Sequence, residues 1–226
     1  YLFELNSHIP IPLYLDTLLL DFLLDFLLYL LYHSKMSISI YKPNSKNTGS
    51  GFSFKIGSSK NNDPALFITS ILQHSYDSVK RQGYFKDNQD NPDKTINLKF
   101  SEFEAGHILY AMRTRSTYKT FHAYGEDKTS IKFMPWAKKA KQSSKNKDGD
   151  WVDEWVEVPA FSVSFVRNGN QNFVIGLEPG ETETVMEFLR FFLSELFSSR
   201  RKRELEYFLE SRSQENPKPK RENPPF

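Results

Sequence analysis

The feature that most constrains this fold is a strand-to-helix unit that occurs twice. Residues 95–113 (TINLKFSEFEAGHILYAMR) align with residues 172–190 (NFVIGLEPGETETVMEFLR) at a constant offset of 77. In each copy an alternating apolar run, typical of a strand, gives way to apolar residues at i, i+3, i+4 and i+7, typical of a helix. Ser101 opens a capping-box sequence before the first helix, and Pro179 follows the second strand. The sequence therefore predicts two related halves.

Short β-branched and aromatic runs precede each helix. In the second half they are residues 118–124, 129–136, 161–167 and 172–177, and Asn168-Gly169 favours a tight hairpin. In the first half they are residues 51–56, 65–73 and 94–100, with a less regular candidate at 79–85 and a helix over 65–75 as an alternative. The predicted fold class is α+β, with two antiparallel β-sheets each followed by a helix, a ββββα unit repeated twice.

Alternation separates the two faces of the second sheet. The inward set should pack on the helix and comprises Phe161, Val163, Phe165, Phe173, Ile175 and Leu177. The outward set comprises Ser162, Ser164, Lys132, Met134 and Trp136. The exposed face is therefore expected to be hydroxylated, basic and aromatic rather than acidic.

The repeat defines one domain at residues 51–197, with halves 51–114 and 116–197. Residues 36–50 are expected to form a flexible lead-in, residues 198–210 a helical extension, and residues 211–226, rich in Pro, Asn and charged residues, a disordered tail. Residues 137–150 hold five lysines and no large apolar residue, which is typical of a mobile loop.

Residues 1–35 differ from the rest of the chain. They are rich in Leu, Phe and Tyr but contain Asp16, Asp21 and Asp25. Each carboxylate would cost about 2.5–3.5 kcal/mol in a bilayer, and no basic stretch marks a signal peptide. We interpret the segment as a non-native extension upstream of Met36. The alternative is a native helix whose Leu/Phe face associates with a partner or with lipid.

Composition excludes several classes of function. The chain has no cysteine, which rules out disulfides, thiolate nucleophiles and cysteine-bound metals and suits a reducing, cytoplasmic location, in a host cell if the protein is viral. The five histidines lack metal-ligand spacing, and the sequence has neither a phosphate-binding glycine loop nor a nucleophile elbow. We therefore expect a protein that is not an enzyme and that needs no cofactor or metal.

Residues 116–141 interleave basic and aromatic side chains. Single-stranded nucleic acids bind to positive grooves that contact phosphates and to rings that stack on bases. Phe121 and Phe133 are expected in the core, and the alternative for the lysines is that they only solvate an edge strand. The candidate phosphate contacts are Lys119, Lys128, Lys132, Lys138, Lys139 and Lys141, and the candidate stacking rings are His122, Tyr124 and Trp136.

The pattern over residues 49–197 resembles a known family. The segments SGFSFKIG, ALFITSILQ, KTINLKFSEFEAGHILYAMR, KTFHAY, KTSIKFMPW, FSVSFVRNG and NFVIGLEPGETETVMEFLRFFL resemble the Whirly-like and transcriptional-positive-cofactor-like single-stranded-DNA-binding proteins, with bacteriophage members closest in pattern. The Lys-Gly-Lys-Ala-Ala-Leu motif of plant Whirly proteins is absent, and WAKKAK at 136–141 is only loosely like it. The resemblance implies two curved sheets packed with helices, single-stranded DNA bound on the sheet surface, and a homo-oligomer.

The leading hypothesis is a single-stranded DNA-binding protein that acts in replication, recombination or repair, encoded by a bacteriophage. Two alternatives stay open: an RNA-binding or annealing factor of the same fold, and a structural or interaction module that binds neither polymer. The C-terminal Pro224, Pro225 and Phe226 resemble the tip of bacterial single-strand-binding proteins, so they either recruit a replication-protein partner or form a frayed end. No membrane partner is expected.

Overall fold

The computed structural model describes residues 36–215. The chain divides after Met36, and the second unit, whose described residues are 37–215, contains the helices and strands. The predictions for residues 1–35 and for the C-terminal tip at Pro224, Pro225 and Phe226 lie outside the described residues.

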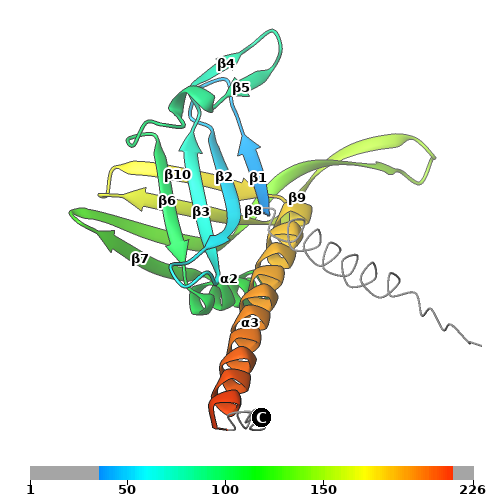
Figure 1. Ribbon diagram of the computed structural model, residues 1–226. Coiled ribbons are helices and arrows are strands. Elements are labelled where there is room, and N and C mark those ends of the chain that lie inside the picture. The colour runs from blue at the N-terminus through cyan, green and yellow to red at the C-terminus, as the bar shows by residue number, and fades with distance from the viewer. Residues whose placement is uncertain (1–35, 216–226) are drawn as a thin grey trace, which may run out of the picture. The chain divides into compact units, whose positions relative to one another are not determined.

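Two four-stranded antiparallel sheets form the body of the second unit (Figure 1). The first sheet has the order β1-β2-β3-β6, with β1 at Ser37–Lys42, β2 at Ser50–Ser58, β3 at Pro64–Leu72 and β6 at Thr95–Phe100. The second has the order β10-β9-β8-β7, with β7 at Tyr118–Tyr124, β8 at Asp127–Lys145, β9 at Trp151–Arg167 and β10 at Gln171–Leu177. Helix α2 (Glu102–Thr114) follows β6, and helix α3 (Pro179–Glu215) follows β10.

The predicted α+β class, with antiparallel sheets and two helices, is confirmed, but an insertion interrupts the first half. Strands β4 (Ser75–Asp77) and β5 (Gln82–Tyr84) and the short helix η1 (Lys86–Asn88) lie between β3 and β6. Buried side-chain amides fasten this insertion to the sheet, because Asn88 Nδ2 donates to the Leu72 carbonyl and Gln73 Nε2 to the Ser75 carbonyl, each at 2.9 Å. The exact ββββα repeat is therefore not reproduced.

The helices begin where the sequence signals place them. The Ser101 hydroxyl accepts a hydrogen bond from the Glu104 backbone N–H, and Glu104 Oε2 accepts one from the Ser101 backbone N–H, so the capping box is complete. Helix α2 ends at Thr114, and its C-cap residue Arg115 adopts the left-handed conformation. At the start of α3 the Glu178 backbone N–H donates to Glu181 Oε2 at 2.8 Å.

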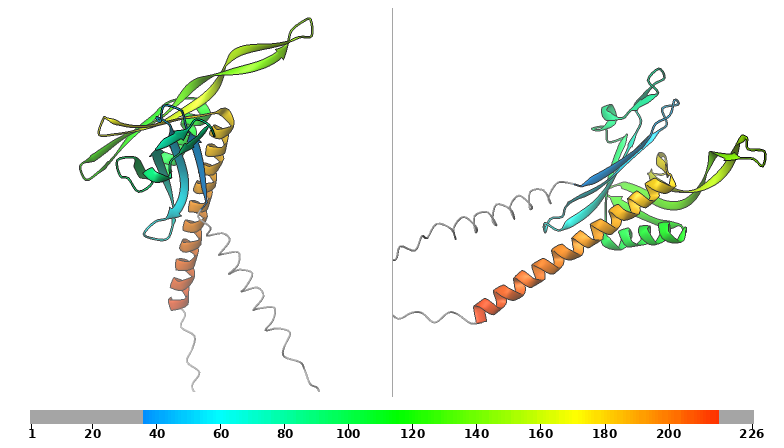
Figure 2. Two further views of the ribbon diagram at one scale, coloured as in Figure 1. Left: turned by 90° about the horizontal axis from the view of Figure 1, so that it is seen from above. Right: turned by 90° about the vertical axis from the view of Figure 1, so that its right-hand side faces the viewer.

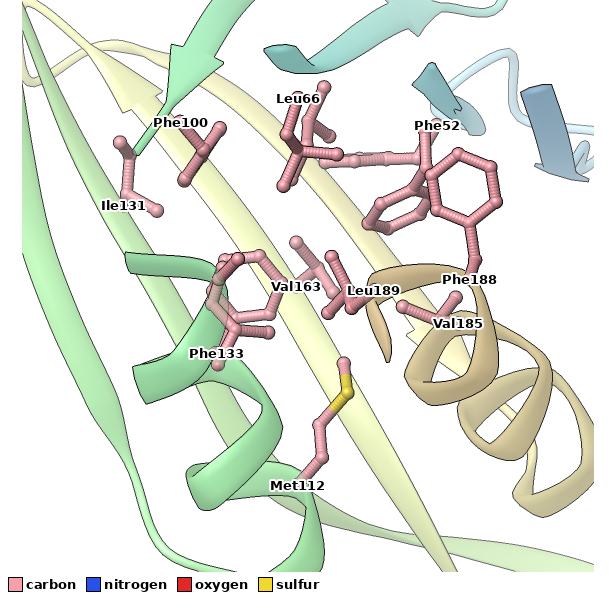
Figure 3. Packing of buried hydrophobic residues seen from close by; sticks show 14 of the residues in the cluster. Phe52, Leu66, Phe100, Met112, Ile131, Phe133, Val163, Val185, Phe188 and Leu189 are labelled. Atoms are coloured by element: carbon pink, nitrogen blue, oxygen red, sulfur yellow. The ribbon is translucent and has the colours of Figure 1, made fainter. Parts of the chain in front are cut away.

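One hydrophobic core joins the inner faces of both sheets to both helices (Figure 3). The predicted inward set of the second sheet is confirmed, since all six side chains are at most 1% exposed. Phe52 of the first sheet meets Phe165 of the second edge to face, with ring centroids 5.0 Å apart. Because the two inner faces share this core, the outer faces of the two sheets point away from each other.

A long hairpin that the sequence did not predict projects from the second sheet (Figures 1 and 2). Strands β8 and β9 stay paired without a register shift as far as Lys145 and Trp151, so residues 137–145 form a strand and not a mobile loop. Lys139 pairs with Glu157 of β9, and Lys141 forms an ion pair with Asp153, so cross-strand charge contacts support a hairpin that buries little apolar surface. We call residues 137–159 the arm.

Three further segments differ from expectation. Residues 37–42 lie in the expected flexible lead-in but form the edge strand β1, paired with β2. Residues 65–72 belong to strand β3, so the helical alternative for this segment is wrong. Helix α3 continues to Glu215, past the expected start of disorder at Ser211.

Candidate nucleic-acid interface

The outer face of the second sheet gathers basic, hydroxyl and aromatic side chains. Paired residues of neighbouring strands share a face, and Lys119 pairs with Lys132, which pairs with Ser164. We call this surface the sheet-2 face. It comprises Lys119, Phe121, Ala123, Lys128, Ser130, Lys132, Met134, Trp136, Ala160, Ser162, Ser164, Val166, Asn172, Val174 and Gly176. None of these residues is acidic.

Three lysines of the sheet-2 face are available to a ligand. Lys119 and Lys128 are exposed, and Lys132 is half-buried between its neighbours. None of the three forms an ion pair within residues 36–215. Because none of the three is paired with a carboxylate, their charges add up to a positive field over the sheet.

Trp136 is the large ring at the arm end of this face. Its indole lies across the sheet on Gly176 of β10, where an added methyl group would come within 2.4 Å of Trp136 Cζ3. Glycine in a strand allows this close approach. The ring is held against the sheet and is still 43% exposed, which leaves surface on which a base can stack.

Phe121 corrects one expectation and adds a residue to the site. Its side chain is 74% exposed on the sheet-2 face, whereas Phe133 is fully buried as expected. Phe121 pairs with Ser130, and this places it on the side opposite Phe133. The register between β7 and β8 determines on which side of the sheet Phe121 lies, and the residues of β7 alone do not reveal this register.

His122 lies on the inner side of β7 and has a structural role. Its Nε2 is 2.7 Å from Glu104 Oε1 on α2, and its ring centroid is 5.1 Å from that of Phe100. Burial alone would raise the pKa of Glu104, but hydrogen bonds from Ser101 and His122 hold the pKa of this carboxyl below its usual value. The contact ties β7 to α2 and removes His122 from the sheet-2 face.

Tyr124 stands apart from the other predicted rings. It is 91% exposed at the turn between β7 and β8, on the side of the sheet opposite Trp136. There it borders a cavity of about 180 Å³ that β6 also lines, together with Arg167. The structure therefore does not bring Tyr124 together with Trp136.

The predicted lysines at 138, 139 and 141 are not equivalent to those of the sheet. Lys138 is bound by Glu178 at the border of the sheet-2 face, and this hydrogen bond, followed by the charge of Lys42, lowers the pKa of Glu178. Lys141 Nζ is 2.5 Å from Asp153 Oδ2, and its hydrogen bond lowers the pKa of Asp153. Lys139 and Lys141 also lie on the other side of the strand from Trp136.

Residues 36–215 contain no group of three or more His, Asp or Glu side chains arranged to hold a metal ion. No helix within these residues combines the length and apolar character needed to cross a bilayer.

Comparison with known proteins gives structural similarities only. No family model matches the chain, and no curated protein matches it. Among solved structures it is similar to WHY3 from Arabidopsis thaliana, at 14% identity over 72% of this chain and 88% of that one, with a TM-score of 0.42. The plant transcriptional regulator PBF-2 is similar at 14% identity over 74% of this chain and 85% of that one, with a TM-score of 0.44. WHY1 from Arabidopsis thaliana is similar at 13% identity over 72% of this chain and 90% of that one, with a TM-score of 0.43.

These three similar structures are of plant proteins, so they add no support to the expected bacteriophage origin.

Proposed function

We propose that this chain is a non-enzymatic protein that binds single-stranded DNA on the sheet-2 face. The observation that carries the proposal is an acid-free sheet surface with three unpaired lysines beside the exposed Trp136 and Phe121. Lys119, Lys128 and Lys132 contact phosphates, and the two rings stack on bases. Every base has a stacking face, so binding is tolerant of sequence.

The sheet geometry suits an unpaired strand. Lys119 and Lys132 are direct neighbours across β7 and β8, where paired Cβ atoms lie about 4.5–5.5 Å apart. A single strand can follow such a row because its backbone is flexible and its bases are free to turn toward the rings. Ser162 and Ser164 add hydroxyl groups beside the lysines that can bond phosphate or base oxygens.

The remaining predicted lysines receive a smaller role in this proposal. A phosphate that approached Lys138 would compete with Glu178, and one that approached Lys141 would compete with Asp153. Charge pairs of this kind reduce the number of counterions released when DNA binds. We therefore assign the steep salt dependence to the lysines at 119, 128 and 132.

A fluorescence anisotropy titration with labelled oligo-dT at two salt concentrations tests the proposal. We expect tight binding in low salt, with an affinity that falls steeply as salt is added. No binding in low salt would eliminate the proposed function. Parallel titrations with oligo-U and duplex DNA separate the alternatives, because equal or tighter binding of oligo-U would identify an RNA-binding factor.

We also propose that the chain forms a homo-oligomer through its helices. A groove of about 610 Å³ runs between α2 and α3 and is lined by Phe103, Tyr110 and Phe197, each more than half exposed. Phe191 adds a further exposed ring on α3. Clusters of exposed aromatic residues of this kind mark protein interfaces. Light scattering should show a multimer that Phe103→Asp or Phe197→Asp dissociates.

The biological setting proposed for this activity follows from the sequence analysis. Protection or exchange of single strands in replication, recombination or repair, in a bacteriophage-infected cytoplasm, is the setting in which such binding is useful. Recruitment of a replication protein by Phe226 is part of the same proposal and concerns residues that the structure does not describe.

A further inference from the structure

The outer face of the first sheet has a composition that the sequence analysis did not single out. Pairing of β1 with β2, β2 with β3 and β3 with β6 defines which side chains share this surface, here called the sheet-1 face. It comprises Ser37, Ser39, Tyr41, Gly51, Ser53, Lys55, Gly57, Ala65, Phe67, Thr69, Ile71, Thr95, Asn97 and Lys99. Like the sheet-2 face, it contains no acidic residue.

A ring lies between two lysines at the centre of this surface. Lys55 of β2 pairs with Phe67 of β3, and Phe67 pairs with Lys99 of β6, so the three side chains form one row across three strands. Both lysines are exposed, and neither forms an ion pair with any described residue. A phosphate on either side of a base stacked at Phe67 would meet an ammonium group.

The ring is positioned as Trp136 is on the other sheet. An added methyl group on Gly57 would lie 3.0 Å from Phe67 Cε2, so the Phe67 ring leans over the neighbouring strand onto a glycine. A side chain at residue 57 would push the ring away from the sheet. A strand glycine, a ring lying on it and unpaired lysines therefore occur together on both outer faces.

Polar groups lie in the next row. The Thr69 hydroxyl donates to Asn97 Oδ1 at 2.9 Å, which fixes the amide orientation, and the Ser39 and Ser53 hydroxyls are 2.6 Å apart. Asn97 Nδ2 has no hydrogen-bond partner in the described part of the chain and faces solvent beside Lys99. It can donate to a phosphate or to a base carbonyl.

We propose that the sheet-1 face is a second binding surface for single-stranded DNA, so that one protomer holds two strand segments. The proposal rests on the proposed function and extends it. The two outer faces point away from each other because the inner faces share one core, so a short strand cannot reach both. A protomer with two such faces can bring two strands together or wrap a longer one.

Binding stoichiometry with a short strand tests the second surface. A labelled oligo-dT of about 8 nucleotides is long enough for one site and too short for two. Titration at protein concentrations well above the dissociation constant, in low salt, should saturate at about two oligonucleotides per chain. The triple variant Lys55→Ala/Phe67→Ala/Lys99→Ala should saturate at about one, and so should Lys119→Ala/Lys132→Ala/Trp136→Ala.

A control variant accounts for charge and aromatic content. Lys80→Ala/Lys86→Ala/Tyr207→Ala removes the same residue types from exposed positions on neither face, and it should keep about two oligonucleotides per chain. Thermal melting checks that each variant is folded. Photocrosslinking of the unmodified protein to an oligonucleotide carrying 5-iodouracil needs no variant, and it should label the peptide that contains Phe67.

The outcomes separate the two proposals. Saturation of the unmodified protein at about one oligonucleotide, with the sheet-1 variant unchanged and no crosslink to β3, overturns the second surface and leaves the proposed function standing. No binding at all by the unmodified protein overturns both. Loss of one equivalent in each face variant, with the control unchanged, supports two separate surfaces.

Discussion

Strands β8 and β9 run through two regions of similar composition but different electrostatics. Within the sheet, Lys128 and Lys132 have no ion pair among the described residues, and Trp136 is held against Gly176. In the arm, residues 137–159 contain five lysines and five carboxylates, so their formal charges cancel. In the arm Lys141 is paired with Asp153 and the formal charges sum to zero, whereas the sheet-2 face has no acidic residue and leaves positive charge for a ligand.

The aromatic residues of the arm also differ from those of the sheet-2 face. Trp151 and Trp155 are 70% and 67% exposed, and Lys145 Nζ lies 5.5 Å from the centroid of the Trp151 ring. In this cation–π contact the Lys145 ammonium group covers one face of the Trp151 ring, so neither group is fully available to a ligand. Lys and Trp in one stretch of sequence are therefore not enough to make an interface, because their partners across the hairpin decide whether they are free.

The largest expected effect separates the lysines of the two regions. In this and the next two comparisons the protein carries Lys55→Ala/Phe67→Ala/Lys99→Ala, so that only the sheet-2 face binds. In that background Lys119→Ala/Lys128→Ala/Lys132→Ala should weaken binding of oligo-dT on the order of 100-fold in low salt and reduce the salt slope by about 2, because three phosphate contacts are lost. The matched variant Lys139→Ala/Lys141→Ala/Lys145→Ala removes the same charge and should change affinity little. Equal losses in both variants would show that only net charge matters and would break the comparison.

A smaller effect is expected for the two kinds of tryptophan. Trp136→Ala should weaken binding about tenfold, since one stacked base contributes roughly 1–3 kcal/mol, and the salt slope should stay the same. Trp155→Ala removes a more exposed ring from the arm and should leave affinity unchanged. Anisotropy titrations at several salt concentrations measure both quantities. A larger loss with Trp155→Ala would move the interface to the arm.

A weaker effect should come from the glycine beneath Trp136. Gly176→Ala places a methyl group where the indole now lies, so the ring must move and affinity should fall about threefold. Gly180→Ala is the control, because an added methyl group there would have no neighbour within 4 Å. Unchanged binding by Gly176→Ala would show that the position of the ring on the sheet is unimportant for stacking.

The sequence predicted the sheet interiors and helix starts better than the surface. Periodicity identified the inward residues Phe165 and Phe173, and the capping box identified the start of α2, because burial and capping leave local patterns. The arm was missed because its strands pair polar residues with each other and bury little apolar surface. The sheet-1 face was missed because Lys55, Phe67 and Lys99 are far apart in sequence and meet only through strand register.

His122 shows the same limit at a single residue. The sequence placed it among basic and aromatic neighbours, but its partner Glu104 comes from the other half of the repeat and could not be read from that stretch. This pairing assigns His122 to the stability of the fold. The two roles make different predictions about the effect of changing Glu104.

The smallest expected effect on binding is therefore for Glu104→Gln, which should act on stability instead. The folded protein lowers the pKa of Glu104, so the stabilisation by its carboxylate is present above the ordinary pKa of 4.5 and is lost as pH falls through the lowered value. Glu104→Gln should lower the free energy of unfolding by about 1 kcal/mol at neutral pH, and the difference from the unmodified protein should shrink below pH 4.5.

Denaturant titrations at neutral and acidic pH measure this difference, and anisotropy at neutral pH should show unchanged binding of oligo-dT by Glu104→Gln. A weakening of binding as large as that expected for Trp136→Ala would place the Glu104–His122 pair in the interface. The separation between side chains that stabilise the fold and side chains that face the DNA would then fail at β7, where the two kinds alternate along the strand.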